Sequence, residues 1–405
     1  MRFILIAHGL IDRSGHHYME ARAFKEEAAR HGLECTILAN RDVSPSIRDE
    51  LDAVPLFQHT PYQKFFRRKH FRSWRDFRFY GKLMGQELCS LPPGTISATD
   101  ILVSPLTRAR DMSGLTYWLA RLPRSQHPFL ALNFMFDDIS RPVGANGGWK
   151  LNLKAAFLYR LAFLRLRHTL APNRIHLSAG GVEFAKAMTR ALDYPVVDFP
   201  LPVQHEIFME SPDIVRPDQA PCIAFLGFMH PRKGAKLAGA VISRVLAKNA
   251  NCRFLLQANP EYWEKRWQDE IGPVASARVH IHRGAMTQDE YQNTMKMAEL
   301  VLLPYPPAGY TLQTSGVFSE AMAMGKVSIV PEGTWMAANV RKYGGGAVMF
   351  SEFEVDSIAA ACLRALEHLP SLKRDMRYIS SHWRENMGMK TFVQRILDAG
   401  KACRT

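Results

Sequence analysis

Residues 303–327 read LPYPPAGYTLQTSGVFSEAMAMGKV, and their pattern indicates the fold class most clearly. An apolar strand ends at Pro304, a loop rich in proline and glycine follows, and a helix begins near Ser315 and Gly316. The Ser315 hydroxyl is suited to cap that helix, and Gly316 lets a ligand approach its first N–H groups closely. The stretch therefore predicts a strand–loop–helix unit of a parallel sheet, with an anion site at its turn.

The same alternation of short apolar runs and amphipathic segments continues along the whole chain. Such alternation is typical of parallel sheets wrapped by helices, one sheet in each half. We therefore predict an α/β protein with two Rossmann-like domains whose parallel sheets face each other across a cleft, with ligands at the carboxyl ends of the strands. The expected strands cover residues 3–7, 34–39, 100–104, 129–136, 174–178 and 196–199, then 223–226, 253–257, 279–282, 300–303, 327–330 and 347–350.

A chain of 405 residues is longer than one ordinary core, which stops growing at about 250–300 residues. The proline-rich stretch 201–221 is the natural linker. We predict an N-terminal domain at 1–200 and a C-terminal domain at 222–380. A final helix within 381–405 is expected to pack back toward the N-terminal domain.

The composition excludes several classes of protein. With 47% hydrophobic and 22% charged residues the chain is neither disordered nor fibrous, and six widely spaced cysteines give no disulfide framework or zinc spacing. The net charge is 52 − 38 = +14, of which residues 1–200 carry 28 − 18 = +10, so an anionic partner should meet that half. The first apolar run is too short for a leader, and no run reaches the ~18 residues of a spanning helix, so we expect a cytoplasmic protein.

A second element of the C-terminal half reads IAFLGFMHPRKG over residues 223–234. It predicts a strand, a turn at Gly227, and a basic pair, Arg232 and Lys233, that opens a helix. Either cation could neutralise a diphosphate. Glu320 lies about one turn into the helix after Ser315, where its carboxylate can accept both hydroxyls of a ribose. Taken singly, each feature also fits a capped helix and ordinary surface charges.

Four motifs together carry a family resemblance. The turn F-L-G-x-x-x-P-R-K-G is followed by RGAMT at 283–287, by AELVLLP at 298–304 and by S-G-x-x-x-E-A-M-A-x-G-K-V. In this order they resemble the donor domain of a GT-B glycosyltransferase of the family 4 type, over about residues 220–370. The N-terminal half resembles the family only in its general layout.

The resemblance implies a role for each matching residue. Glu320 corresponds to the glutamate that binds the nucleotide ribose, and Lys233 to the lysine that binds the diphosphate. The loop 283–286 corresponds to the backbone that grips the base. The donor-nucleotide site implied in this way consists of Glu320, Lys233, Arg232, Ser315, Gly316, Gly227, Gly284 and Met286.

The chain departs from the family pattern at two places. The first glutamate of the E-x7-E motif, which contacts the donor sugar or the site beside it, would fall at Leu312. Gln313, Thr314 or the Tyr310 hydroxyl are the candidates to replace it. The usual arginine before the lysine is also missing, and Arg232 is the candidate to stand in for it.

The first strand of the N-terminal half ends in the loop HGLIDRSGHHY, residues 8–18. Gly15 suits a close approach to a phosphate, with His16 and His17 beside it, and His16 is a catalytic candidate. The strand at 129–136 ends in Asp137 and Asp138, which could accept the proton of an acceptor hydroxyl. Purely structural histidines and an Asp–Asp turn that caps a loop are equally open. We expect no metal site here and no cofactor beyond the nucleotide-sugar co-substrate, because helix dipoles and cations can stabilise the leaving diphosphate.

These features together predict a glycosyltransferase of the hexosyltransferase type that moves a sugar from a nucleoside diphosphate to a hydroxyl acceptor. The resemblance implies retention of anomeric configuration, and we connect the activity with cell-envelope polysaccharide or glycolipid synthesis. A sugar-nucleotide-binding protein without transfer is the alternative that Leu312 motivates. A nucleic-acid-binding protein ranks last, because the charge is unaccompanied by any nucleic-acid-binding motif.

The segment 62–82 combines eight Lys/Arg and eight aromatic residues with one acid. On a helix it would present a basic stripe beside an aromatic one, which suits an anionic membrane surface at the inner membrane. An ordinary helix that packs its aromatic residues inward is equally open. The cations that would contact the membrane are Lys64, Arg67, Arg68, Arg72 and Arg75.

Overall fold

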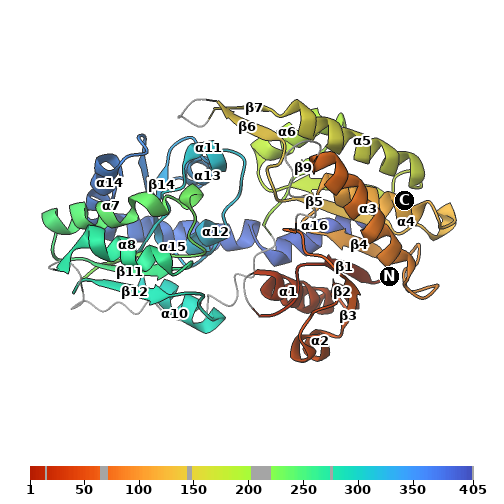
Figure 1. Cartoon of the computed structure of the whole chain (residues 1–405), viewed down its shortest axis with the longest axis horizontal. Helices are drawn as coiled ribbons and strands as arrows, with labels where there is room; N and C mark the ends of the chain where they lie inside the picture. The colour runs from red at the N-terminus through yellow and green to blue at the C-terminus, as the bar shows by residue number, and fades with distance from the viewer. Residues whose placement is uncertain (14–15, 64–71, 144–147, 202–219, 274–276, 404–405) are drawn as a thin grey trace. The chain divides into compact units, whose positions relative to one another are not determined.

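The computed structural model describes the chain apart from residues 14–15, 64–71, 144–147, 202–219, 274–276 and 404–405. The chain divides into two units (Figure 1). Unit 1 contains residues 1–141, 151–204 and 388–405, and unit 2 contains residues 142–150 and 205–387.

Unit 1 is built on a seven-stranded sheet in the order β3-β2-β1-β4-β5-β8-β9, and every printed pairing in it is parallel. The order reverses direction between β1 and β4, which makes this pair the topological switch point. The strands are β1 (Phe3–Ala7), β2 (Cys35–Asn40), β3 (Ala53–Phe57), β4 (Ile101–Ser104), β5 (Phe129–Phe134), β8 (Ile175–Ala179) and β9 (Val197–Asp198).

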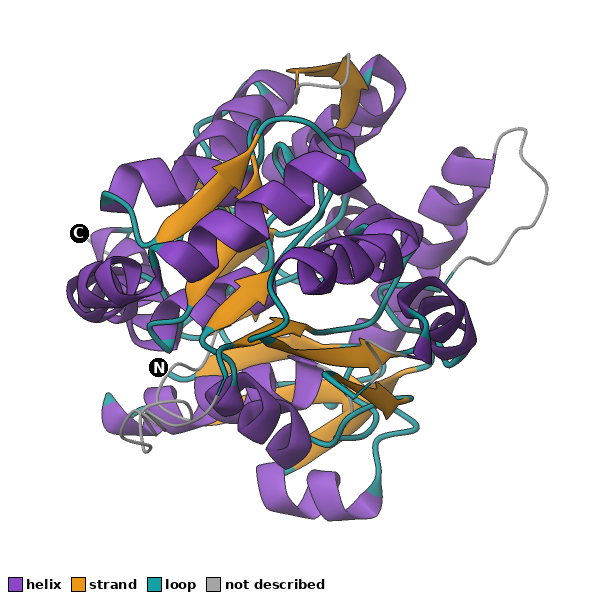
Figure 2. Cartoon of the chain, turned by 90° about the vertical axis from the view of Figure 1, so that its left-hand side faces the viewer, coloured by secondary structure: helices purple, strands orange, loops and turns teal. Residues whose placement is uncertain are grey.

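Figure 2 shows the strands of the chain flanked by helices, and in unit 1 helices pack on both faces of the sheet. On one face, Phe3 and Leu5 join a core with α1 (His16–Arg30) and α16 (Met389–Ala402). Because side chains alternate along a strand, the other residues face the opposite layer, where Phe134 meets Tyr159 of α5. That layer contains α3 (Arg72–Cys89), α4 (Ala109–Leu119) and α5 (Leu153–Thr169), and the remaining elements of unit 1 are α2 (Pro45–Leu51), α6 (Val182–Leu192) and the short helix Arg124–Gln126. The two-stranded pair β6 (Ser140–Val143) and β7 (Gly148–Leu151) lies mostly within residues 142–150, which belong to unit 2.

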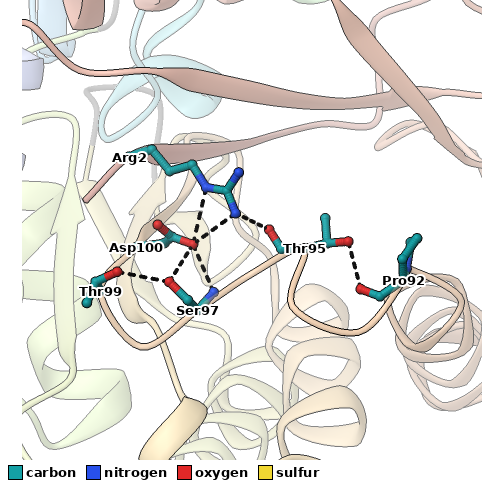
Figure 3. A network of polar contacts seen from close by, with 6 residues as sticks. All are labelled: Arg2, Pro92, Thr95, Ser97, Thr99 and Asp100. Atoms are coloured by element: carbon teal, nitrogen blue, oxygen red, sulfur yellow. Dashed lines mark hydrogen bonds and ion pairs between the residues drawn. The ribbon is translucent and has the colours of Figure 1, made fainter.

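A polar network fixes the amino ends of β1 and β4 relative to each other (Figure 3). The buried Asp100 carboxylate accepts hydrogen bonds from the Ser97 N–H at 2.8 Å and the Ser97 hydroxyl at 3.0 Å, and it pairs with the Arg2 guanidinium at 3.4 Å. Arg2 also donates to the Thr95 carbonyl. The network lies at the edge of the sheet opposite to the carboxyl ends of its strands, and it stabilises the register there.

Unit 2 contains a six-stranded sheet in the order β12-β11-β10-β13-β14-β15, and its printed pairings are all parallel. Its switch point lies between β10 and β13. The strands are β10 (Cys222–Phe225), β11 (Arg253–Ala258), β12 (Val279–Arg283), β13 (Leu300–Leu302), β14 (Val327–Pro331) and β15 (Ala347–Phe350). The helices are α7 (Ala235–Lys248), α8 (Tyr262–Ile271), α10 (Gln288–Met297), α11 (Pro307–Tyr310), α12 (Gly316–Ala323), α13 (Trp335–Tyr343), α14 (Val355–Glu367) and α15 (Leu369–Asn386), with a short 3₁₀ turn at Pro231–Lys233.

The two parallel α/β sheets confirm the predicted fold class. The central strands are buried on both faces, as their continuous apolar runs indicate. Among the described residues, no helix is both long enough and apolar enough to span a bilayer.

Candidate functional site

The candidate donor site of unit 2 lies where β10 and β13 end side by side. Parallel strands bring the loops that follow them to the same edge of the sheet, and a switch point separates those loops so that a ligand can enter. The loop after β10 carries Gly227, Arg232 and Lys233, and the loop after β13 leads into α12.

Two glycines shape the loop after β10. Gly227 has φ +97° and Gly234 has φ +75°, backbone conformations that residues with a Cβ adopt at a cost. A Cβ on Gly234 would lie 2.1 Å from the Pro304 carbonyl oxygen, so the two loops are in direct backbone contact. A Cβ on Gly227 would come within 3.2 Å of the Lys233 Nζ. The ammonium of Lys233 is therefore held close over the turn that ends β10.

Lys233 stands in a low-dielectric, partly buried setting. Its ammonium lies 5.6 Å from the centroid of the buried Tyr305 ring. Burial lowers the pKa of Lys233 to about 8, and the neighbouring Glu320 carboxylate opposes that shift. Arg232, the other predicted cation, is exposed on the same turn. A cation of this kind gains by binding an anion, because the anion replaces the water that burial removes.

The Glu320 carboxylate is oriented by a residue that the motif analysis did not identify. The Tyr291 hydroxyl, from α10, donates a hydrogen bond of 2.5 Å to Glu320 Oε2. Burial raises the pKa of Glu320, while the Tyr291 hydrogen bond and Lys233 act against this. Glu320 is thus a positioned acceptor near a cation, which is the arrangement that a sugar hydroxyl pair beside a diphosphate requires.

Helix α12 begins as the sequence predicts. The Ser315 hydroxyl accepts a hydrogen bond from the Phe318 N–H at 3.2 Å, which makes Ser315 the N-cap. At Gly316 the space that a Cβ would occupy has no described atom within 4 Å. The positive end of the helix dipole therefore lies beside open space at Gly316, while the Ser315 cap uses the Phe318 N–H.

The candidate donor-sugar residues lie in the loop before α12. Leu312, at the position of the missing glutamate, is only 1% exposed, so its side chain belongs to the core. Gln313 is half-buried and its amide donates to the Thr314 carbonyl at 3.4 Å. The Tyr310 ring packs 4.6 Å from Tyr305, and burial raises the pKa of Tyr310 to about 12.

Gln257, at the carboxyl end of β11, ties two loops of the site together and was not singled out from the sequence. Its amide oxygen accepts from the Gly227 N–H at 2.9 Å, and its amide nitrogen donates to the Gly284 carbonyl at 3.3 Å. Gly284 has φ +72°, and the nearby Met286 is half-buried. A single buried amide thus sets the spacing between the diphosphate loop and the predicted base loop.

In unit 1 a group of histidines lies at the end of β1. The buried His8 follows β1, and the His17 ring occupies the space beside Gly9. The Tyr62 hydroxyl lies 3.1 Å from His17 Nε2 and 3.4 Å from His16 Nε2. Burial lowers the pKa of His16. Burial, with the neighbouring His16 and His8, lowers the pKa of His17 to about 2, so the His17 ring is neutral at pH 7. Gly15 lies outside the described residues.

His16, His17 and Glu20 offer ligand atoms within 4.8 Å of one another. The His16 and His17 rings also lie close together, with their centroids 4.2 Å apart. Because this cluster could hold a metal ion, the expectation of no metal site stays a prediction. Burial raises the pKa of Glu20 to about 8, and its Oε1 has no hydrogen-bond partner in the described structure.

The two aspartates after β5 differ in their contacts. Asp137 accepts hydrogen bonds from both the N–H (2.9 Å) and the hydroxyl of Ser140, so it caps the turn into β6. Burial raises the pKa of Asp137 despite these bonds. Asp138 is exposed, accepts from the Tyr159 hydroxyl at 3.0 Å and pairs with Arg108 at 3.3 Å. The contacts of Asp137 match the capping alternative, whereas Asp138 is the more accessible of the two.

The predicted membrane segment is described only in part. Lys64, Arg67 and Arg68 lie outside the described residues, as does the side chain of Arg72. Arg75 is exposed on α3.

Comparisons with known proteins agree with this fold. Residues 220–368 match the family described as glycosyl transferases group 1. Among solved structures, a glycosyltransferase from Rickettsia africae ESF-5 is similar with a TM-score of 0.64 at 11% identity, covering 100% of this chain and 98% of that one. HepE from Anabaena in complex with UDP has a TM-score of 0.62 at 11% identity, with 99% and 100% covered. Sucrose-phosphate synthase from Thermosynechococcus elongatus has 0.61 at 13% identity, with 100% and 98% covered. A sequence comparison with curated proteins finds no match.

The fold and the matched domain define the class of protein as a glycosyltransferase of the GT-B fold. Residues 220–368 match the model of the glycosyl transferases group 1, and this match covers less than half of the chain. The predicted GT-B fold and the predicted transferase class are confirmed. Membership of family 4 within that group stays a prediction, and the structural likeness at 11% identity concerns the fold alone.

Proposed function

We propose that the chain transfers a sugar from a nucleoside-diphosphate sugar to a hydroxyl acceptor. The observation that carries this proposal is the convergence of Lys233, Glu320 and the start of α12 at one switch point. HepE and other structures of similar fold bind UDP or a UDP sugar, which supports a nucleotide sugar as donor here.

Each group then has a definite part in the chemistry. Negative charge builds up on the diphosphate as the bond to the sugar breaks, and the Lys233 ammonium and the α12 N-terminus stabilise it, with Arg232 at the exposed side. The Glu320 carboxylate, held by Tyr291, accepts the ribose hydroxyls and thereby positions the nucleotide. Gly284 and Met286 contact the base. Gln313, Thr314 and Tyr310 are the candidates for the sugar.

For the transfer itself we propose retention of configuration without a divalent ion. A leaving phosphate oxygen helps to remove the acceptor proton, since the cations and the helix start already hold the diphosphate. His16 and Asp138 are the unit 1 candidates that could assist. Asp137 ranks below them because the Ser140 hydrogen bonds occupy its carboxylate.

The acceptor side is proposed on the charge of the chain. The N-terminal half carries most of the +14 net charge, which favours an acceptor or surface bearing phosphate or carboxylate groups. We propose a cytoplasmic protein, peripheral at the inner membrane, that acts in envelope polysaccharide or glycolipid synthesis on a lipid-linked hydroxyl.

A sugar-nucleotide-binding protein without transfer is the second candidate, because a buried Leu312 replaces the family's first glutamate. Release of free nucleoside diphosphate from UDP-, GDP- and ADP-sugars by the purified protein separates the two. Slow hydrolysis of one donor, lost in Lys233→Ala and kept in the exposed control Lys248→Ala, is expected of a transferase. Tight binding with no release of diphosphate, with or without added lipid extract, would favour the binding protein.

A further inference from the structure

The outer face of α5 in unit 1 carries an apolar ridge that the sequence analysis did not single out. The helix buries Ala156, Tyr159, Ala162, Phe163 and Leu166 against the unit. On the opposite side Leu153 is 75% exposed, Phe157 62% and Leu164 48%. Scattered single exposures of this kind are ordinary, but three large apolar side chains on one line are not.

The geometry of the helix places cations on both sides of this ridge. At about 100° per residue, Leu153, Phe157 and Leu164 fall within an arc of roughly 40°. Lys154 and Arg165 lie on one flank of the ridge, and Arg160 and Arg167 lie on the other. The helix sequence LKAAFLYRLAFLRLRHT contains four Lys/Arg and no acid.

The two flanks differ in how much charge they present. Arg160 pairs with Asp193 of unit 1 at 2.8 Å, and Arg167 lies 5.2 Å from the Tyr194 ring. The Asp193 carboxylate offsets the charge of Arg160, whereas Arg167 keeps its charge beside the neutral Tyr194 ring. Lys154 and Arg165 are exposed on the other side, which therefore carries the larger net positive charge.

The basic and aromatic character continues onto the neighbouring helices. Helices α3, α4 and α5 follow one another side by side in unit 1 (Figure 1). A groove of about 620 Å³ runs between them, lined by Trp74, Arg75, Phe79, Lys82, Tyr117 and Arg165. Arg165 joins the groove to the α5 ridge, and Phe79 is 48% exposed beside it. The face is therefore one continuous surface with apolar, aromatic and cationic groups.

We propose that the outer face of α5, together with the groove beside it, docks onto an anionic lipid bilayer. An apolar ridge sinks into the boundary between headgroups and acyl chains, while flanking cations stay at the level of the phosphates. The long aliphatic stems of Lys154 and Arg165 let their charged groups reach the phosphates while the helix lies deeper. Docking itself does not depend on the proposed function. Only the further step, in which docking brings a lipid-linked acceptor to unit 1, rests on that function.

Charge complementarity and apolar contact favour an anionic bilayer over a second copy of the chain or a nucleic acid. A second copy of the chain would bring the same cationic face against itself, which is repulsive. A nucleic acid would match the charge, but it would leave Leu153, Phe157 and Leu164 without an apolar contact. An anionic bilayer satisfies both the cations and the ridge.

Vesicle co-sedimentation of the full chain tests the proposal, with phosphatidylglycerol–phosphatidylcholine vesicles and pure phosphatidylcholine vesicles as probes. We expect binding to the anionic vesicles alone, weakening as salt shortens the Debye length below about 8 Å. Phe157→Ser with Leu164→Ser should lower the partition coefficient by roughly tenfold or more. Lys154→Ser with Arg165→Ser should lower it similarly at low salt. Tyr378→Ser, an exposed aromatic residue of unit 2, should leave it unchanged.

Several results would overturn the docking surface. One is that the wild-type protein stays in the supernatant with anionic vesicles at low salt. Another is that both double variants bind the anionic vesicles as well as the wild type does. The apparent molecular mass of the protein is also measured without vesicles. If it rises with protein concentration, and Phe157→Ser with Leu164→Ser abolishes that rise, the face binds a second copy of the chain instead. Unfolding midpoints of both double variants verify folding, and the charge variant keeps the test valid if the ridge variant misfolds. Nucleotide binding is measured on the same samples: lipid binding without nucleotide binding would refute the proposed function and leave the docking surface standing.

Discussion

The pKa of Lys233 makes donor binding depend on pH in a direction that the structure fixes. Burial lowers this pKa to about 8, so the free protein loses the ammonium charge as pH rises through that value. The diphosphate of a nucleoside-diphosphate sugar is fully ionised throughout this range. If only the charged lysine binds it, affinity is retained below pH 8 and lost above it.

The size of the effect follows from the fraction of charged lysine. With a pKa of about 8 this fraction falls from roughly 0.9 at pH 7 to roughly 0.1 at pH 9, which is about tenfold in affinity or about 1.4 kcal/mol. The bound diphosphate raises the pKa of the lysine in the complex, so binding should take up a proton near pH 8.

Calorimetric titration of the donor between pH 7 and 9 measures this dependence, with the bare nucleoside as reference for any titration of the base. In Lys233→Arg the side chain stays charged, so the profile should become flat even if the affinity at pH 7 is lower. A tenfold loss that persists in Lys233→Arg, or a flat profile in the wild type, would refute the assignment of the diphosphate to Lys233.

Three further substitutions test other parts of the site. Glu320→Gln should cost about 1.5–3 kcal/mol of nucleotide binding by calorimetry, whereas Glu367→Gln, exposed at the end of α14, should cost nothing; equal affinities would remove Glu320 from the ribose. Gln257→Leu leaves two partly buried backbone groups, the Gly227 N–H and the Gly284 carbonyl, without their hydrogen-bond partner, so we expect about 1 kcal/mol less stability in denaturant unfolding, together with weaker nucleotide binding; unchanged binding would mean that the two loops keep their spacing without Gln257. Gly234→Ala should lower the unfolding midpoint well beyond Gly344→Ala, since both have positive φ but only the first would clash with a backbone carbonyl; equal losses would contradict the tight loop contact.

The alternation of apolar runs was enough to predict both sheets, because a strand buried on two faces has to be apolar throughout its length. The same alternation did not predict the strand at the edge of the unit 1 sheet. Strand β3 (Ala53–Phe57) contains Pro55, which argues against a central strand. The structure places β3 at the edge of the sheet, where a missing N–H costs little.

The site was predictable where a backbone motif defines it and not where tertiary packing does. The cap at Ser315 and the turn at Gly227 follow from local sequence, and the structure shows both. Gln257 and Tyr291 carry no local signal. Each becomes meaningful only when the sheet brings its strand or helix beside a loop distant in sequence.

The most direct test of the central claim is a thermal-shift screen of the wild type with UDP, GDP, ADP and their sugars. A ligand that binds only the folded state at a hundredfold excess over its Kd adds about 2.7 kcal/mol of stability. We predict that diphosphates of one base stabilise the wild type and the Lys248→Ala, Glu367→Gln double variant, and do not stabilise the Lys233→Ala, Glu320→Gln double variant. No stabilisation of the wild type by any nucleotide, or equal stabilisation of both double variants, would contradict a donor site at this switch point.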